Sequence, residues 1–242
     1  MTRKYEFTGE TSNSIAEGAT LHRIRAVRDF GNVKAGDLGG WIQKEENLNH
    51  SGDCWIYDRA AAFGNARVSG NASLRNEALA YDNAFITDHA LIERDASVFG
   101  RARIYDRVVV TDRASIYRDA VLYGRTRVQD RAVIGNFAYI SGNDVLIGGD
   151  ACIQIPCSIR NGAYVMSNRD FLTIGPIGSE NGVLTAYRSK DGLMVNRGCF
   201  TGTLDVFKAA VEETHGDNKY GRSYAALVEF IKVHFGEEVR RA

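Results

Sequence analysis

The sequence repeats with a period of six residues between Cys54 and Val165. Steps of six from Cys54 to Ala138 meet fifteen residues, of which twelve are alanine. The residue two positions further on is aliphatic in all fifteen units, from Ile56 to Ile140. An amphipathic helix needs a period of about 3.6, so a period of six with an in-phase period of two predicts β-structure.

The period of two within each unit has a direct physical meaning. Residues two apart on a β-strand point to the same side, so each unit supplies one small and one branched side chain to an interior. The position four after the small residue turns a corner, and residues that tolerate a left-handed backbone occupy most of these corners. They are Asp58, Gly64, Gly70, Asn76, Asp82, Asp88, Gly100, Asp106, Asp112, Gly124, Asp130, Asn136 and Gly142.

Three units close one triangular coil of about 18 residues, and coils stack at about 4.8 Å, the spacing between β-strands. The chain is therefore predicted to be mainly β, with a parallel β-helix of about six coils over residues 51–166. One extra residue near Asn143 and Asp144 shifts the frame, after which the pattern resumes at Val145.

Residues 1–50 are expected to cap one end of the β-helix, because its open strand edges would otherwise invite aggregation. A strand is expected over residues 21–27. Residues 39–42 are expected to form a turn followed by a plug, with Trp41 in the core. Trp55 is assigned to an outward face of mixed composition that we expect to be wet.

Residues 167–242 lose the period of six and predict a small α+β module. Strands are expected over residues 171–177 and 183–188, followed by a hairpin turn at Ser189–Gly192 and a return strand over 193–197. Thr203 is expected to cap a first helix, and a second helix is expected from Tyr220 to Phe235. The module is predicted to dock on the β-helix or to bury its own elements, and to serve partner recognition or oligomerisation.

The repeat units resemble those of the left-handed β-helix of hexapeptide-repeat proteins. The chain is also similar to the YdcK-like hexapeptide-repeat proteins of bacteria and prophages, over roughly residues 20–165. That likeness rests on Ala26–Phe30, Val33–Gly36, Gly39–Trp41 and Gly52–Asp58. The resemblance implies a left-handed coil and trimeric assembly, and members of the group are often labelled as acetyltransferases.

Outward side chains can be sorted by face, because residues 18 apart stack on one another. Phe63, Tyr81, Phe99 and Tyr117 form a ladder of aromatic residues at this spacing, while Tyr105 and Tyr123 belong to another face. The rings could simply stiffen the coil by stacking. They could also form a contact face, because monomers rarely leave so large an apolar patch open. We predict a binding face that includes these six residues.

Arginines gather on outward positions near the corners. Arg101, Arg103, Arg107 and Arg125, the predicted basic strip, could hold an anionic ligand or an acidic protein surface. The plainer interpretation is a solvated edge with ion pairs.

The composition limits the classes of partner. Lys and Arg number 30, and so do Asp and Glu, so no global charge attracts nucleic acid or an anionic membrane. No apolar run of about 18 residues could span a membrane, and no secretion signal is recognisable. The four cysteines are scattered, which favours a reduced, cytoplasmic setting in a bacterial host cell. We expect neither a cofactor nor a bound metal.

One residue is a candidate for catalysis. Hexapeptide acyltransferases typically use a histidine base near a loop that leaves the coil, and His89 alone of the five histidines lies within the regular coils. No insertion breaks the register between Cys54 and Ile140. His89 is therefore expected to be catalytic only if the chain is an acyltransferase.

The leading hypothesis is a non-catalytic protein that binds or inhibits a protein partner, or acts as a scaffold, and forms a dimer or trimer. Because the resemblance includes prophage-borne proteins, a phage protein that acts against a bacterial defence or host complex is a concrete version. The alternatives are an acyltransferase of the hexapeptide class and a binder of an anionic small molecule at subunit interfaces.

Overall fold

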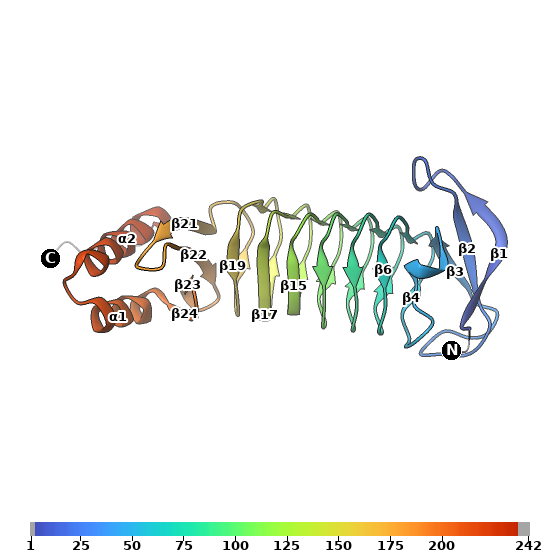
Figure 1. The fold of residues 1–242 in the computed structure, drawn as a ribbon, viewed down its shortest axis with the longest axis horizontal. Coiled ribbons are helices and arrows are strands. Elements are labelled where there is room, and N and C mark those ends of the chain that lie inside the picture. Colours follow the sequence, from blue (N-terminus) through green and yellow to red (C-terminus); the bar gives the residue numbers. More distant parts are fainter. Residues whose placement is uncertain (1–2, 237–242) are drawn as a thin grey trace.

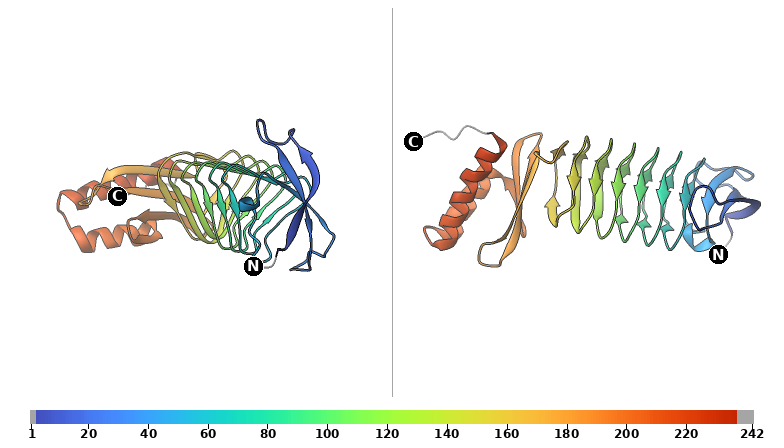
Figure 2. Two further views of the ribbon diagram at one scale, coloured as in Figure 1. Left: turned by 45° about the vertical axis from the view of Figure 1, so that its right-hand side comes forward. Right: turned by 90° about the horizontal axis from the view of Figure 1, so that it is seen from above.

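The computed structural model describes residues 3–236. The chain forms an elongated prism, with antiparallel strands at the N-terminal end and a sheet with two helices at the other (Figure 1). Seen from above, the coils between these ends follow one another at even spacing (Figure 2). The predicted fold class is confirmed: a mainly β protein built on a parallel β-helix, with an N-terminal cap and a C-terminal α+β module.

Short parallel strands stack into three columns, which form the three faces of the prism. The ladder face consists of β3 (Leu38–Ile42), β5 (Ala61–Ala62), β8 (Leu79–Ala80), β11 (Ser97–Val98), β14 (Ser115–Ile116), β16 (Val133–Ile134) and β18 (Cys152–Ile153). The mixed face consists of β4 (Trp55–Ile56), β7 (Ser73–Leu74), β10 (Leu91–Ile92), β13 (Val109–Val110), the second parts of β15 (Val121–Val128) and β17 (Ala138–Ile147), and β20 (Tyr164–Val165). The tyrosine face consists of β6 (Arg67–Val68), β9 (Phe85–Ile86), β12 (Arg103–Ile104), the first parts of β15 and β17, and β19 (Cys157–Ile159).

The register follows the predicted repeat. Partners in neighbouring coils are 18 residues apart, as in Ser97 opposite Ser115. The alternation of small and branched interior residues is also present, since Ala96 and Val98 are both fully buried. The predicted frame shift is found between β15 and β17, where Gly124 lies opposite Gly142 but Thr126 lies opposite Val145.

The number of coils differs from the prediction. Within residues 3–236 the ladder face contains seven strands, because β3 lies parallel to β5 with Trp41 opposite Ala61. That pair is 20 residues apart, so steps of six do not reach it. The expected turn at residues 39–42 is part of this strand. A Cβ at Gly40 would lie 2.4 Å from the Ala60 carbonyl oxygen, so only glycine lets the strand approach the next coil.

The environments of the two tryptophans in and beside the N-terminal cap are the reverse of those predicted. It consists of β1 (Tyr5–Ser12), β2 (Leu21–Ala26), β3 and the short 3₁₀-helix η1 (Glu45–Asn47). Trp55 is only 1% exposed, because the rings of Tyr5 and Phe30 lie over it with centroids 6.2 and 5.3 Å away. Trp41, expected in the core, is instead half-buried on the outer side, with the Arg23 guanidinium 5.9 Å from its ring.

A buried lysine joins the cap to the first regular unit of the repeat. Lys4 Nζ donates to the Cys54 carbonyl oxygen at 2.7 Å and lies 3.1 Å from Cys54 Sγ, while the Phe30 ring is 5.0 Å away. Burial lowers the pKa of Lys4 and raises the pKa of Cys54. Cys54 occupies a position where most units have alanine. Its thiol contacts the Lys4 ammonium group of the cap.

The C-terminal module closes the other end of the prism. Its antiparallel sheet consists of β21 (Phe171–Ile177), β22 (Gly182–Ser189), β23 (Gly192–Arg197) and β24 (Phe200–Thr203), and it is followed by α1 (Leu204–His215) and α2 (Lys219–Phe235). Thr203 caps α1 as predicted, and its hydroxyl accepts the Val206 N–H. Strand β24 was not expected from the sequence.

Strand β22 uses its two sides differently. The hydroxyls of Thr185 and Tyr187 accept the backbone N–H groups of Ser158 and Arg160 at 3.1 and 3.2 Å. Leu184 and Ala186, on the opposite side, belong to a separate core with the two helices. The module therefore covers the last coil's open strand edge, in line with the expectation that it docks on the β-helix.

Candidate interaction surfaces

The four ladder residues stack as a continuous row of rings. Successive ring centroids from Phe63 to Tyr117 are 5.1, 4.8 and 5.3 Å apart, and the ring planes deviate by 4°, 4° and 17°. All four side chains are half-buried. The fixed 18-residue register sets this geometry, because each ring occupies the same outward position one coil above the last.

One end of the ladder is covered by the chain itself. Ile15, Ala16 and Ala19, in the loop between β1 and β2, belong to an apolar cluster with Phe63 and Leu79. The cluster lies on the outside of the ladder face and ends at these two residues. The face thus packs against apolar side chains at its N-terminal end, and the ladder continues beyond them with Tyr81, Phe99 and Tyr117.

The remaining two predicted contact residues lie elsewhere. Tyr105 and Tyr123 point outward from the tyrosine face. The Tyr105 ring is tilted against Phe85, with centroids 5.9 Å apart, and the Tyr123 hydroxyl is hydrogen-bonded to that of Tyr139. The six predicted contact residues therefore lie on two faces of the prism, as their spacing along the sequence indicated.

The predicted basic strip is divided in the same way. Arg101 Nε lies 2.7 Å from Asp119 Oδ1, at the corner between the ladder and tyrosine faces. Arg103 lies on the tyrosine face, and Arg107 and Arg125 lie at the corner that follows it. Within residues 3–236, no carboxylate oxygen lies within 4.0 Å of the guanidinium of these last three.

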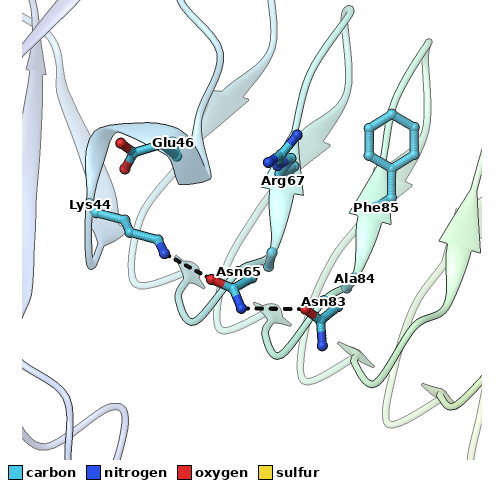
Figure 3. Close-up of a pocket in the computed structure, with 8 residues that line it drawn as sticks. Lys44, Glu46, Asn65, Arg67, Asn83, Ala84 and Phe85 are labelled. Atoms are coloured by element: carbon cyan, nitrogen blue, oxygen red, sulfur yellow. Dashed lines mark hydrogen bonds between the residues drawn. The ribbon is translucent and has the colours of Figure 1, made fainter.

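A shallow pocket lies where the tyrosine face meets the cap (Figure 3). Its volume is about 430 Å³, and Lys44, Glu46, Arg67 and Phe85 contribute to its lining. Asn65 and Asn83 form a short row of amides at its edge: Lys44 Nζ donates to Asn65 at 2.9 Å, and Asn65 donates to Asn83 at 3.3 Å (Figure 3). The sequence did not predict this pocket, because Lys44 and Glu46 come from the irregular cap.

The candidate catalytic histidine is an exposed corner residue. His89 Nε2 lies 3.1 Å from Asn71 Nδ2, one coil away. In the described part of the chain, no group of three or more His, Cys, Asp or Glu residues is arranged to hold a metal ion. None of the described helices is both long and apolar enough to cross a membrane.

No family model matches the chain. It is similar to the uncharacterized acetyltransferase YdcK of Escherichia coli strain K12, with 40% identity over 79 residues, a stretch that covers 30% of this chain and 24% of the relative. The chain thus matches about a quarter of the relative's length. Together with the fold, this places the chain among β-helix proteins with distant similarity to a protein described as an acetyltransferase.

Proposed function

We propose that this chain is a protein-binding scaffold and that its ladder face receives the partner. The observation that carries the proposal is the continuous ring stack from Phe63 to Tyr117. Within residues 3–236, the apolar cluster formed with the chain's own loop includes Phe63 at the first end of this stack and none of the other three rings. A partner segment with apolar side chains would continue the packing that Ile15, Ala16 and Ala19 begin.

The rigidity of the ladder suits it to binding. Each ring is held by its neighbours and by a backbone paired on both sides, so little side-chain freedom remains to be lost on association. Aromatic residues also supply large contact areas, which is why they are common among the residues that dominate interface energies. A homodimer or homotrimer that packs ladder against ladder is one version of this proposal. A phage-encoded inhibitor of a bacterial defence complex is another, supported by the resemblance to prophage proteins.

Substitution of two ladder residues tests the proposal. The double variant Tyr81→Arg, Phe99→Arg should remove self-association or partner capture, because two charges would be desolvated in an apolar contact. Mass in solution by light scattering and pull-down from bacterial lysate measure the effect. The matched control is Leu91→Arg, Val109→Arg, which places two arginines on half-buried outward positions of the mixed face in the same two coils.

Circular dichroism should show both double variants folded. Equal loss of association in both would show that the ladder face has no special role. Unchanged mass together with unchanged capture in the ladder variant would contradict the proposal and leave the rings a purely structural stack.

Acyl transfer is the second candidate, favoured by the description of the E. coli relative. It requires binding of coenzyme A or a related acyl donor, and His89 would be the base. Isothermal titration with acetyl-coenzyme A, followed by the same titration and an acetylation assay on His89→Ala, tests it. Absence of binding at millimolar donor would exclude this candidate.

A further inference from the structure

The arginines of the coils fall into groups that differ in their contacts. Five pair with a carboxylate: Arg59 with Glu77, Arg94 with Asp112, Arg101 with Asp119, Arg113 with Asp95 and Arg131 with Asp150. Others contact a ring or an amide, such as Arg75 over Tyr57 and Arg118 at Asn136. Within the described coils, four have no such side-chain contact. These unpaired arginines are Arg67, Arg103, Arg107 and Arg125.

The unpaired arginines all lie on one side of the prism. Arg67 and Arg103 are outward residues of β6 and β12 on the tyrosine face, and Arg107 and Arg125 follow at the corner between the tyrosine and mixed faces. The outward positions of the tyrosine face from Arg67 to Ser141 contain no Asp or Glu. The neighbouring positions at its corner are Asn71, His89 and Asn143, which are not acidic. Acidic residues flank this stretch of the corner, because Asp53 lies one coil before Asn71 and the bulge adds Asp144 after Asn143.

Two acidic residues of the tyrosine–mixed corner, Asp88 and Asp106, are engaged with the backbone. Asp88 Oδ2 accepts the N–H of Asp106 at 3.0 Å, and Asp106 Oδ2 accepts the N–H of Gly124 at 2.9 Å. These bonds hold successive corners together and orient the carboxylates along the stack. At the ladder–tyrosine corner and the mixed–ladder corner, by contrast, acidic residues stand one coil away from arginines and pair with them.

The four arginines are spread along the prism axis over a length that a short extended chain could cover. Arg67 and Arg125 are separated by three coil steps, which is about 14 Å at the usual strand spacing, or the length of about four extended residues. The last of these three steps separates Arg103 and Arg107 from Arg125, which lies one coil further along the axis. A segment with acidic residues at alternate positions could reach these guanidinium groups, which bind carboxylates with two parallel hydrogen bonds.

The aromatic residues between the arginines favour a protein over a single-stranded nucleic acid. Base stacking needs open ring faces. Here Phe85 is tilted against Tyr105, and Tyr123 packs edge to face with Tyr139, so the rings are engaged with one another. A surface of tyrosine and arginine is typical of the residues that dominate protein interfaces.

We propose that the tyrosine face and its unpaired arginines bind an acidic, extended segment of a partner protein. This surface is separate from the ladder face, so the proposal stands whether or not the ladder binds a partner. Binding would weaken steeply as salt rises, because the contacting charges are exposed.

A labelled peptide tests this proposal. The probe is a short fluorescein-labelled peptide of alternating glutamate and alanine, and fluorescence anisotropy at low salt measures its binding to the full chain. The variant Arg107→Gln, Arg125→Gln should weaken binding about tenfold, as expected for the loss of two exposed charge pairs. The control Arg59→Gln, Arg113→Gln removes the same charge from the mixed–ladder corner and should change binding less than about twofold.

A peptide of alternating glutamine and alanine should not bind. The proposal is overturned if the glutamate peptide fails to bind at low salt, if both double variants lose affinity equally, or if an oligothymidylate binds more tightly than the peptide. Should the first variant fail to fold by circular dichroism, Arg67→Gln, Arg103→Gln provides an independent pair with the same expected loss.

Discussion

At the scale of single residues, the corners explain why the repeat contains aspartate as well as glycine. Asp106 adopts a left-handed backbone with φ of 54°, and its carboxylate accepts a backbone N–H of the next coil. Glycine tolerates the same conformation but supplies no acceptor. Asn76 resembles the aspartates, since its side chain accepts the Arg94 N–H at 3.2 Å.

We expect Asp106→Ala to lower the free energy of unfolding by about 1–2 kcal/mol, because alanine adds left-handed strain and removes an acceptor. Asp106→Asn should cost clearly less, since asparagine tolerates the conformation and keeps the acceptor. Urea unfolding measures both. Equal losses in the two variants would argue against the hydrogen bond.

The cap contains a histidine that resists protonation. His50 stacks on Tyr5 with ring centroids 4.3 Å apart, and its Nδ1 accepts the Lys4 N–H at 3.3 Å. Burial lowers the pKa of His50 below its ordinary value, and the nearby Glu45 opposes this only in part. As pH falls through about 6.5, the unfolded chain therefore binds a proton that the folded chain resists.

Stability should thus decrease on acidification through the ordinary histidine range, and the loss should be complete once pH is below the folded pKa of His50. His50→Gln keeps an acceptor for Lys4 but does not titrate, so its stability should depend less on pH. Urea unfolding at a series of pH values between neutral and mildly acidic compares the two proteins. Parallel curves would assign the effect to other groups.

At the scale of elements, the two ends of the β-helix are closed by different means. The N-terminal end adds an irregular coil through β3, and its core continues into the cap around Trp55. The C-terminal end uses side-chain hydroxyls of β22 to satisfy backbone N–H groups of the last coil. In both places, strand edges that could recruit another chain are covered.

Removal of one hydroxyl at the C-terminal end should be costly. Tyr187→Phe leaves the part-buried Arg160 N–H without its acceptor, which we expect to cost about 1–2 kcal/mol. Hydrogen exchange at the Arg160 amide should also become faster. Tyr164→Phe is the control, because this tyrosine is 45% exposed on β20 and its loss should be close to neutral. Similar effects in both variants would contradict the capping role.

At the scale of the whole molecule, the coils behave as interchangeable layers. Between Trp55 and Ile134 the coils contact their neighbours through the same 18-residue register, so stability should be roughly the sum of coil and interface contributions. Deletion of residues 97–114 removes one full coil and preserves every later position. We expect the shortened protein to fold and its Tm to fall by only a few degrees, about the change caused by 1–2 kcal/mol.

Deletion of residues 97–113 is the matched control. It removes one residue fewer and sends the small and branched side chains of the following unit to the outside, because a shift of one residue reverses the two sides of a strand. Circular dichroism and thermal melting compare the two deletions. Comparable melting of both would show that the register is less strict than the structure indicates.

The sequence by itself determined the features that depend on spacing along the chain. The period of six defined the interior from Ala60 onward, the extra residue near Asn143 located the bulge, and cap and turn signals located the C-terminal hairpin and helices. Each of these follows from local backbone geometry, which short-range patterns report.

Only the tertiary structure decided how irregular segments meet the coils and which charges find partners. It placed β3 as an additional strand 20 residues before its partner, buried Trp55 beneath the cap, and brought Lys4 to Cys54. It also showed that Arg101 pairs with Asp119, whereas Arg103 has no carboxylate partner among the described residues. These contacts join residues that no fixed period relates, or depend on where a side chain lies across a corner, so they follow from packing in three dimensions rather than from spacing.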